Sequence, residues 1–331
     1  MSLPNVHLND FILGKVVKRP VLRGVALIKR HLQGSEVWFI VLAGGVGLIA
    51  GVMAALLGHF AHLLQSMLYG FSPDLRLSAL PEIEPWHLIA LPLGGAALGL
   101  VRFIFPRRTR QPIDVVEANA LYGGRIPLRD SLIVSFQTFL SNGFGASVGL
   151  EAAYAQLGGG IASKIGQWLD LKRASLRTLV GAGAGAAIGA AFNAPLAGAF
   201  YAFELVLGGY TVAALAPVAA ASLMAVLAAQ LMNIEPFVIA STVGQTIEIS
   251  GYLLYAVLGV LCAGVGIAII RLVASVEAVV RKLPIGDIWR PMIGGLFLIP
   301  VAWAAPQALS SGHGAMHLYM AQQAAILTLL A

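Results

Sequence analysis

The chain is 331 residues long, and 58% of these residues are hydrophobic whereas only 11% are charged. Soluble domains carry roughly 25% charged residues, so this composition excludes a water-soluble globular protein. The formal net charge is +6, but the basic residues are not interleaved with aromatic residues on a soluble segment, which excludes a nucleic-acid-binding module.

Residues 1–36 are predicted to form a basic lead-in on the cytoplasmic side of a membrane. Apolar residues mix loosely with basic ones here, which is typical of a segment that lies along a membrane surface. Lysine and arginine concentrate on the cytoplasmic side, so the N-terminus is expected to stay inside. No signal peptide is predicted, because no short apolar core is followed by a small-residue cleavage site. The basic residues before the first apolar stretch are Lys15, Lys18, Arg19, Arg23, Lys29 and Arg30.

Several later stretches are apolar enough to cross a hydrocarbon core about 30 Å thick. The first is expected to run outward and the second to return, because arginines follow the second stretch and mark the cytoplasmic side. The acidic linker 74–84 would then lie outside. The sequence therefore predicts a multi-pass membrane protein. The notable stretches are 37–69, 87–105, 211–232, 252–280 and 292–305.

Two parts of the sequence repeat each other. Residues 50–52 (Ala-Gly-Val) return as 263–265, and the pair 94–95 (Gly-Gly) returns as 294–295. Pro106 likewise returns as Pro306. Similar halves with interrupted helices are typical of transporters that bind their substrate between the halves. We therefore predict a first transmembrane repeat over 37–235 and a second over 236–331 that is cut short; an accidental match of glycine-rich helices is the alternative.

Glu151 is the main candidate for a functional side chain. It follows a glycine-rich segment that should break one helix, so a new helix is expected to start near Glu151 with unpaired backbone amides inside the membrane. Such amides and the helix dipole form an anion site, which a glutamate could occupy when ionised and leave when protonated or displaced. The alternative is a carboxylate that only caps its helix. The predicted anion-binding amides are those of Gly149, Leu150, Glu151, Ala152 and Ala153.

A second broken element is predicted over 111–120. Pro112 suits a first helical turn, and Asp114 and Glu117 suit the positive end of a helix dipole. This helix could aim its amides at the same anion, or it could simply be a charged helix start on the cytoplasmic side. The candidate anion-binding amides here are those of Pro112, Ile113, Asp114 and Val115.

Residues 181–189 place small residues at every fourth position, which lets helix backbones approach closely in lipid. A break follows, with Asn193 predicted as the N-cap of the next helix and Pro195 just inside it. Glu204 lies on that helix. As a carboxylate within the membrane, it is a candidate for proton movement or for a structural hydrogen bond.

Enzyme activity is not expected, because no nucleophile lies at a workable spacing from a base. No catalytic residue, metal site or cofactor is predicted. The histidine pairs are His59 with His62 and His313 with His317, and neither is joined by carboxylates at a metal-ligand spacing.

Three segments resemble the CLC family of chloride channels and proton-coupled chloride exchangers. Residues 149–152 (Gly-Leu-Glu-Ala) are similar to the family's Gly-Arg/Lys-Glu-Gly-Pro segment, whose glutamate is the gate. Residues 190–198 (Ala-Ala-Phe-Asn-Ala-Pro-Leu-Ala-Gly), followed by Glu204, resemble the segment after it. Residues 310–314 resemble a serine and glycine loop of the family's second half. The resemblance implies an all-α fold of two inverted repeats with broken helices, and a homodimer in a bacterial inner membrane.

The resemblance also implies that the chain passes chloride, but several positions depart from the family pattern. The family's Gly-Ser-Gly-Ile-Pro loop is not recognisable before Val115, and Leu205 replaces the inner proton-transfer glutamate of the exchangers. The family's later anion ligands would lie beyond Ala331. The missing loop bears on anion selectivity, whereas Leu205 favours a passive channel gated by Glu151. The alternatives are a proton-coupled exchanger and, from another class, a non-transporting scaffold or sensory subunit.

Overall fold

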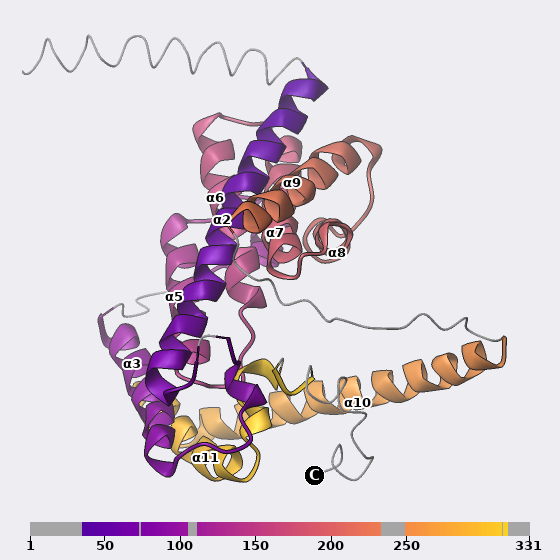
Figure 1. The fold of residues 1–331 in the computed structure, drawn as a ribbon. Helices are drawn as coiled ribbons and strands as arrows, with labels where there is room; N and C mark the ends of the chain where they lie inside the picture. Colours follow the sequence, from indigo (N-terminus) through magenta and orange to yellow (C-terminus); the bar gives the residue numbers. More distant parts are fainter. Residues whose placement is uncertain (1–34, 73, 105–110, 233–248, 313, 317–331) are drawn as a thin grey trace, which may run out of the picture.

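The computed structural model describes residues 35–72, 74–104, 111–232, 249–312 and 314–316. Every regular element in this part of the chain is a helix (Figure 1), which confirms the predicted all-α fold class. Most of the predicted lead-in and the predicted boundary between repeats lie outside the described residues. The helices are α2 (Glu36–Tyr69), α3 (Ala90–Ile104), α4 (Val115–Leu121), α5 (Leu128–Gly143), α6 (Glu151–Trp168), α7 (Arg173–Ala191), α8 (Pro195–Tyr201), α9 (Val212–Leu231), α10 (Ile249–Lys282) and α11 (Arg290–Ala304), with the short elements η1 (Leu77–Ala79), η2 (Pro85–Ile89), η3 (Ala202–Leu207), η4 (Pro306–Ala308) and η5 (Ser310–Gly312).

Four helical segments are long and apolar enough to span a membrane, and they agree with four of the predicted apolar stretches. The fifth stretch forms α11, which has 15 residues. At about 1.5 Å per residue, α11 is shorter than a hydrocarbon core of about 30 Å. The apolar helices therefore form a polytopic membrane protein. The four spans are Glu36–Tyr69, Pro85–Ile104, Val212–Leu231 and Gly251–Lys282.

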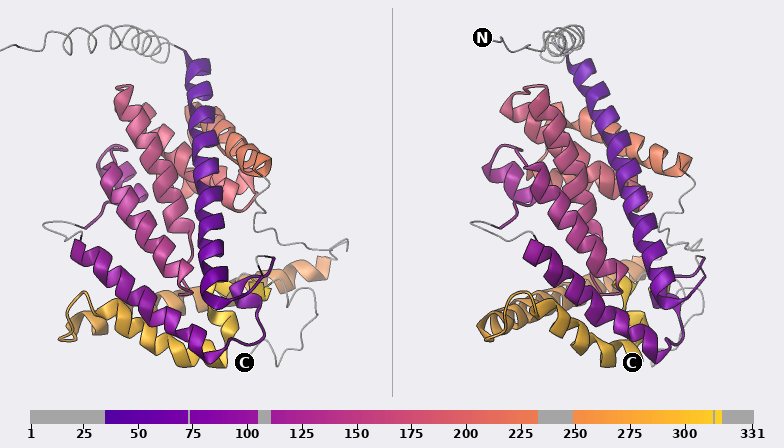
Figure 2. Two further views of the ribbon diagram at one scale, coloured as in Figure 1. Left: turned by 60° about the vertical axis from the view of Figure 1, so that its left-hand side comes forward. Right: turned by 90° about the vertical axis from the view of Figure 1, so that its left-hand side faces the viewer.

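Helix α7 is the centre of the larger bundle, and it packs against α2, α6, α8 and α9 (Figure 2). Its glycines allow the neighbours to approach closely. A Cβ on Gly183 would meet the carbonyl oxygen of Gly158 on α6, and one on Gly185 would collide with the carbonyl oxygen of Gly198 on α8. Small residues let helices come this near in lipid, where packing replaces the hydrophobic effect as the driving force.

Helices α3 and α11 lie side by side at the other end of the molecule. A Cβ on Gly95 of α3 would collide with the carbonyl oxygen of Pro291, and a Cβ on Gly295 of α11 would collide with that of Leu91. Each glycine thus contacts the residue that lies four positions before the other glycine in the sequence. This reciprocal contact is the packing expected of two copies related by a two-fold axis. The lengths agree as well, because α2 and α10 have 34 residues each, and α3 and α11 have 15 each.

Helix α10 projects away from the rest of the described chain (Figure 1). No part of its most apolar 18-residue window is buried, whereas 44% of the corresponding window of α2 is buried. A helix that is hydrophobic all round is stable only in lipid or inside protein. The described residues therefore leave the apolar surface of α10 uncovered, and the candidate site lies elsewhere, in the bundle around α6 and α7.

Candidate anion site at the start of helix α6

Helix α6 begins at Glu151, where the sequence predicted a helix start. Leu150 occupies the N-cap position, and its side chain does not cap the helix. Within the described residues, no acceptor pairs with the backbone amides from Gly149 to Ala153. These donors and the positive end of the helix dipole point away from α6, as an anion site requires.

The carboxylate of Glu151 folds back over the start of its own helix. A Cβ on Gly149 would collide with Oε2 of Glu151, so only glycine leaves room for this arrangement. Glu151 is partly exposed, whereas Ala153 and Tyr154 just after it are buried. The carboxylate therefore lies at the edge of the buried bundle, beside the free amides.

The segment from Asn142 to Val148 leads into this site and is held by side chains of other helices. Tyr69 at the end of α2 donates from its hydroxyl to the carbonyl oxygen of Phe144, at 2.9 Å. Asn142 donates from Nδ2 to the carbonyl oxygen of Val148, at 2.7 Å. Gln65, one turn before Tyr69, donates to Asn142. Sequence reasoning missed these residues, although a polar glutamine within an apolar span is itself a signal.

The second broken element differs from the prediction. Helix α4 begins at Val115 rather than at Pro112, and Asp114 is its N-cap, accepting a hydrogen bond from the amide of Glu117 at 2.7 Å. Pro112 therefore lies before the helix, not in its first turn. The reason is the side chain of Asp114, which caps the helix more effectively than Pro112, two residues before it, can start one.

Two of the four amides predicted in this element cannot bind an anion as expected. Pro112 has no backbone N–H. The amide of Ile113 donates to the carboxylate of Asp130 on α5, at 3.2 Å. The predicted ligands Pro112 and Ile113 are therefore wrong, and only the amides of Asp114 and Val115 remain as candidates.

The structure nevertheless brings α4 and α6 together, and α8 packs against α7 beside them. Gln156 on α6 donates from Nε2 to the carbonyl oxygen of Ile113, at 3.0 Å. The carboxylates of Asp114 and Glu151 both act electrostatically on the hydroxyl of Tyr201, on α8. Sequence reasoning did not identify Tyr201. The negative charge of Asp114, next to the amides of Asp114 and Val115, opposes a bound anion.

Asn193 is not the N-cap of α8, as the sequence suggested. It has a left-handed backbone (φ 51°) just after α7. The amides of Asn193 and Ala194 donate to the carbonyl oxygens of Ala190 and Gly189, which closes α7 in a Schellman motif. Asn193 Oδ1 accepts from Gln230 on α9, at 2.8 Å. The position suits asparagine because this residue tolerates a left-handed conformation. Pro195 is the first residue of α8.

Glu204 lies in η3, a π-helical segment, and its side chain is exposed. Tyr210 donates from its hydroxyl to Oε1 of Glu204, at 2.7 Å. This hydrogen bond raises the pKa of Tyr210 above its ordinary value. Leu205, beside Glu204, is exposed too.

The described histidines form no metal site. Within the described residues, no three histidine, cysteine or carboxylate side chains are grouped as a metal site requires. The rings of His59 and His62 contact Phe60 and Phe71. His313 and His317 lie outside the described residues.

The fold and this site define a class of protein: an all-helical, multi-pass membrane protein in which broken helices start inside the bundle with free backbone amides. The family model described as "Voltage gated chloride channel" matches residues 93–331. The chain therefore belongs to the CLC family of voltage-gated chloride channels. Members of this family transport chloride and related anions through membranes and are not enzymes.

Individual relatives agree with this assignment. The voltage-gated ClC-type chloride channel ClcB of Escherichia coli O17:K52:H18 is 26% identical over 287 residues, which are 85% of this chain and 68% of ClcB. A chloride/fluoride channel protein of Pseudomonas syringae pv. tomato is 28% identical over 288 residues, which are 83% of this chain and 58% of that protein. The chain thus spans only part of the length of each relative.

Two solved structures have the same fold. A slow cyanobacterial Cl⁻/H⁺ antiporter has a TM-score of 0.71 at 24% identity, covering 88% of this chain and 70% of that one. A CLC-type fluoride/proton antiporter has a TM-score of 0.62 at 25% identity, covering 81% of this chain and 67% of that one. The predicted CLC fold is confirmed.

Proposed function

We propose that the chain forms a passive channel for chloride or a similar small anion, and that Glu151 is its gate. The position of the Glu151 carboxylate carries this proposal, because it folds back over Gly149 beside free amides. An ionised carboxylate there occupies the place that a permeating anion would take. Protonation, or displacement by an anion, opens the pathway. The proposed ligands are the amides of Gly149, Leu150, Glu151, Ala152 and Ala153, with those of Asp114 and Val115.

A passive mechanism is supported by Leu205, which replaces the inner proton-transfer glutamate that the resemblance implies for exchangers. A proton-coupled exchanger is the second candidate, because the two solved structures named above are both antiporters of protons and anions. In that case Glu204, which already accepts a hydrogen bond from Tyr210, would replace the inner relay.

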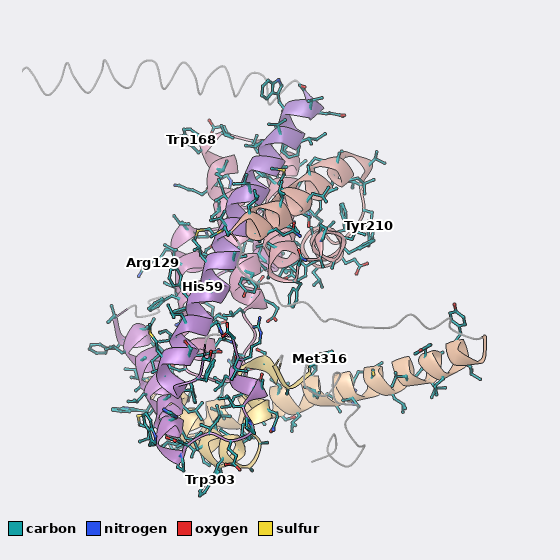
Figure 3. The ribbon with its side chains drawn as sticks, viewed as in Figure 1. His59, Arg129, Trp168, Tyr210, Trp303 and Met316 are labelled. Carbon is teal, nitrogen blue, oxygen red and sulfur yellow. The ribbon has the colours of Figure 1, made fainter. Side chains whose placement is uncertain are left out.

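We further propose a homodimer in a bacterial inner membrane, with a cytoplasmic N-terminus. Exposed apolar side chains on α8 and α9, among them Leu196 and Val212, support a protein or lipid contact there. The bacterial relatives support the location. Lys172 and Arg173 follow α6 near Trp168, at the end of the molecule where α2 begins (Figure 3), which fits a cytoplasmic side.

The test is anion efflux from liposomes containing the full chain, with proton movement recorded at the same time. Wild type is compared with Glu151→Gln across a range of pH, and with Glu204→Gln, which tests the relay of the second candidate. We expect wild type to pass chloride with a dependence on pH that Glu151→Gln abolishes. A flat proton trace supports the channel, whereas coupled proton flux that Glu204→Gln removes supports the exchanger. If the folded protein passes no anion, the transport proposal is refuted, and the non-transporting scaffold or sensory subunit becomes the remaining interpretation.

A further inference from the structure

Three polar side chains from distant parts of the chain form a cluster: the buried Gln65 on α2 and Asn142 on α5, and the partly buried Ser310 in η5. Nε2 of Gln65 lies 2.9 Å from the carbonyl oxygen of Asn142, 2.8 Å from its Oδ1 and 2.8 Å from Oγ of Ser310. Gln65 is 4% exposed and Asn142 is 5% exposed. Polar side chains at this depth in a membrane protein are costly unless hydrogen-bonded, so their presence calls for a role.

The cluster is joined directly to the segment that enters the gate. Nδ2 of Asn142 donates to the carbonyl oxygen of Val148, which immediately precedes Gly149. The backbone amide of Ser310 donates to the carbonyl oxygen of Gly145, at 3.3 Å. The backbone from residue 142 to 148 is thus held from both sides. Gln65 is the only one of the three cluster side chains that is bonded to both of the others.

We propose that Gln65 is a positioning residue for the gate. By holding Asn142 against Ser310, it fixes the backbone of Val148 and Gly149, so that the carboxylate of Glu151 rests over the start of α6. This inference rests on the proposed role of Glu151. It adds a residue on another helix that never touches the anion and yet sets how firmly the pathway is blocked.

The competing explanation is purely structural, because Gln65 also satisfies a carbonyl at the C-terminus of α5. The two explanations differ in what they predict for Glu151. Loss of a structural cap lowers stability whether or not residue 151 carries a charge. Loss of a positioning residue changes flux only while a carboxylate is there to be positioned. Other charged or titratable groups act on this end of α6, namely Arg76, Asp114, Tyr154 and Tyr201. The hydrogen bonds that Gln65 donates go to Asn142 and Ser310.

The experiment is a double-mutant cycle on chloride efflux from liposomes, with wild type, Gln65→Leu, Glu151→Gln and the double variant. Leucine is close to glutamine in size and removes the donor. We expect Gln65→Leu to raise efflux at neutral pH by roughly fivefold for each hydrogen bond lost, and to flatten the dependence on pH. In the Glu151→Gln background the same substitution should leave efflux unchanged.

Ser163→Ala is the matched control, because Ser163 is a fully buried, hydrogen-bonded residue near the other end of α6. It should lower thermal stability without changing the pH profile. If Gln65→Leu does not fold, Ser310→Ala removes one acceptor of Gln65 and should give a smaller change in the same direction. Equal effects of Gln65→Leu in both backgrounds, or an unchanged pH profile, overturn the proposal. If neither Glu151→Gln nor Gln65→Leu changes efflux, the gate itself is refuted. The Glu151→Gln variant alone reports on the gate separately from the role of Gln65.

Discussion

Replacing Gly149 with alanine should open the pathway without removing the carboxylate of Glu151. Gly149 does not have a positive φ, so alanine can adopt its backbone without strain. The added Cβ would collide with Oε2 of Glu151, and overpacking costs about 1–3 kcal/mol. A carboxylate at an accessible helix N-terminus gains only about 0.3–1 kcal/mol. The cost of the collision therefore exceeds the gain from the helix N-terminus, and the flexible side chain of Glu151 moves away.

A change of about 1–2 kcal/mol should reduce the blocked population by roughly 5–30-fold. The assay is chloride efflux from liposomes at a pH where Glu151 is ionised, with thermal unfolding measured in parallel. Gly45→Ala on α2 is the control, because a Cβ there meets nothing within 4 Å. Faster efflux for Gly149→Ala alone is the expected result. Efflux and a pH profile equal to those of wild type would show that the carboxylate does not block the site from this position.

Three further substitutions test other parts of the structure. Gly183→Val on α7 should destabilise the bundle by about 1–3 kcal/mol in thermal unfolding, whereas Gly259→Val on α10, where a Cβ meets nothing within 4 Å, should not; equal losses would contradict the packing. Asp114→Asn keeps the helix cap but removes a repelling charge, so chloride should bind a few-fold more tightly by calorimetry, a gain of about 1 kcal/mol. Glu204→Gln should lower the pKa of Tyr210 toward its ordinary value of about 10, seen in the ultraviolet titration of phenol; no change would argue against their hydrogen bond.

Helix ends that depend on one local signal could be predicted from the sequence. The start of α6 at Glu151 follows a glycine-rich break, and proline at the first position of α8 follows from its missing N–H and fixed φ. The close approach of α6 and α7 likewise follows from regularly spaced small residues. Each of these features is set by residues that are neighbours in the sequence.

Features that depend on competition between neighbouring signals were predicted wrongly. Asn193 can cap a following helix or close a preceding one. In the structure its backbone is left-handed and it closes α7. Pro112 and Asp114 can both start a helix, and the capping side chain prevailed. The amide of Ile113 was assigned to an anion, but a carboxylate 17 residues later, Asp130, takes it.

The hydrogen bonds around the site explain why the sequence predicts the helix start at Glu151 but not the side chains that hold the preceding segment. Glu151 is visible because one carboxylate stands alone among small residues, and its place at a helix start is a local property. Gln65 and Ser310 are 245 residues apart, and their contact follows only from the packing of the whole chain. The anion ligands proposed here are backbone amides, which any residue except proline supplies. Changes in side chains beside Glu151, such as Leu150 or Ala152, therefore leave the donors in place, provided that the backbone leading into α6 is held where it is.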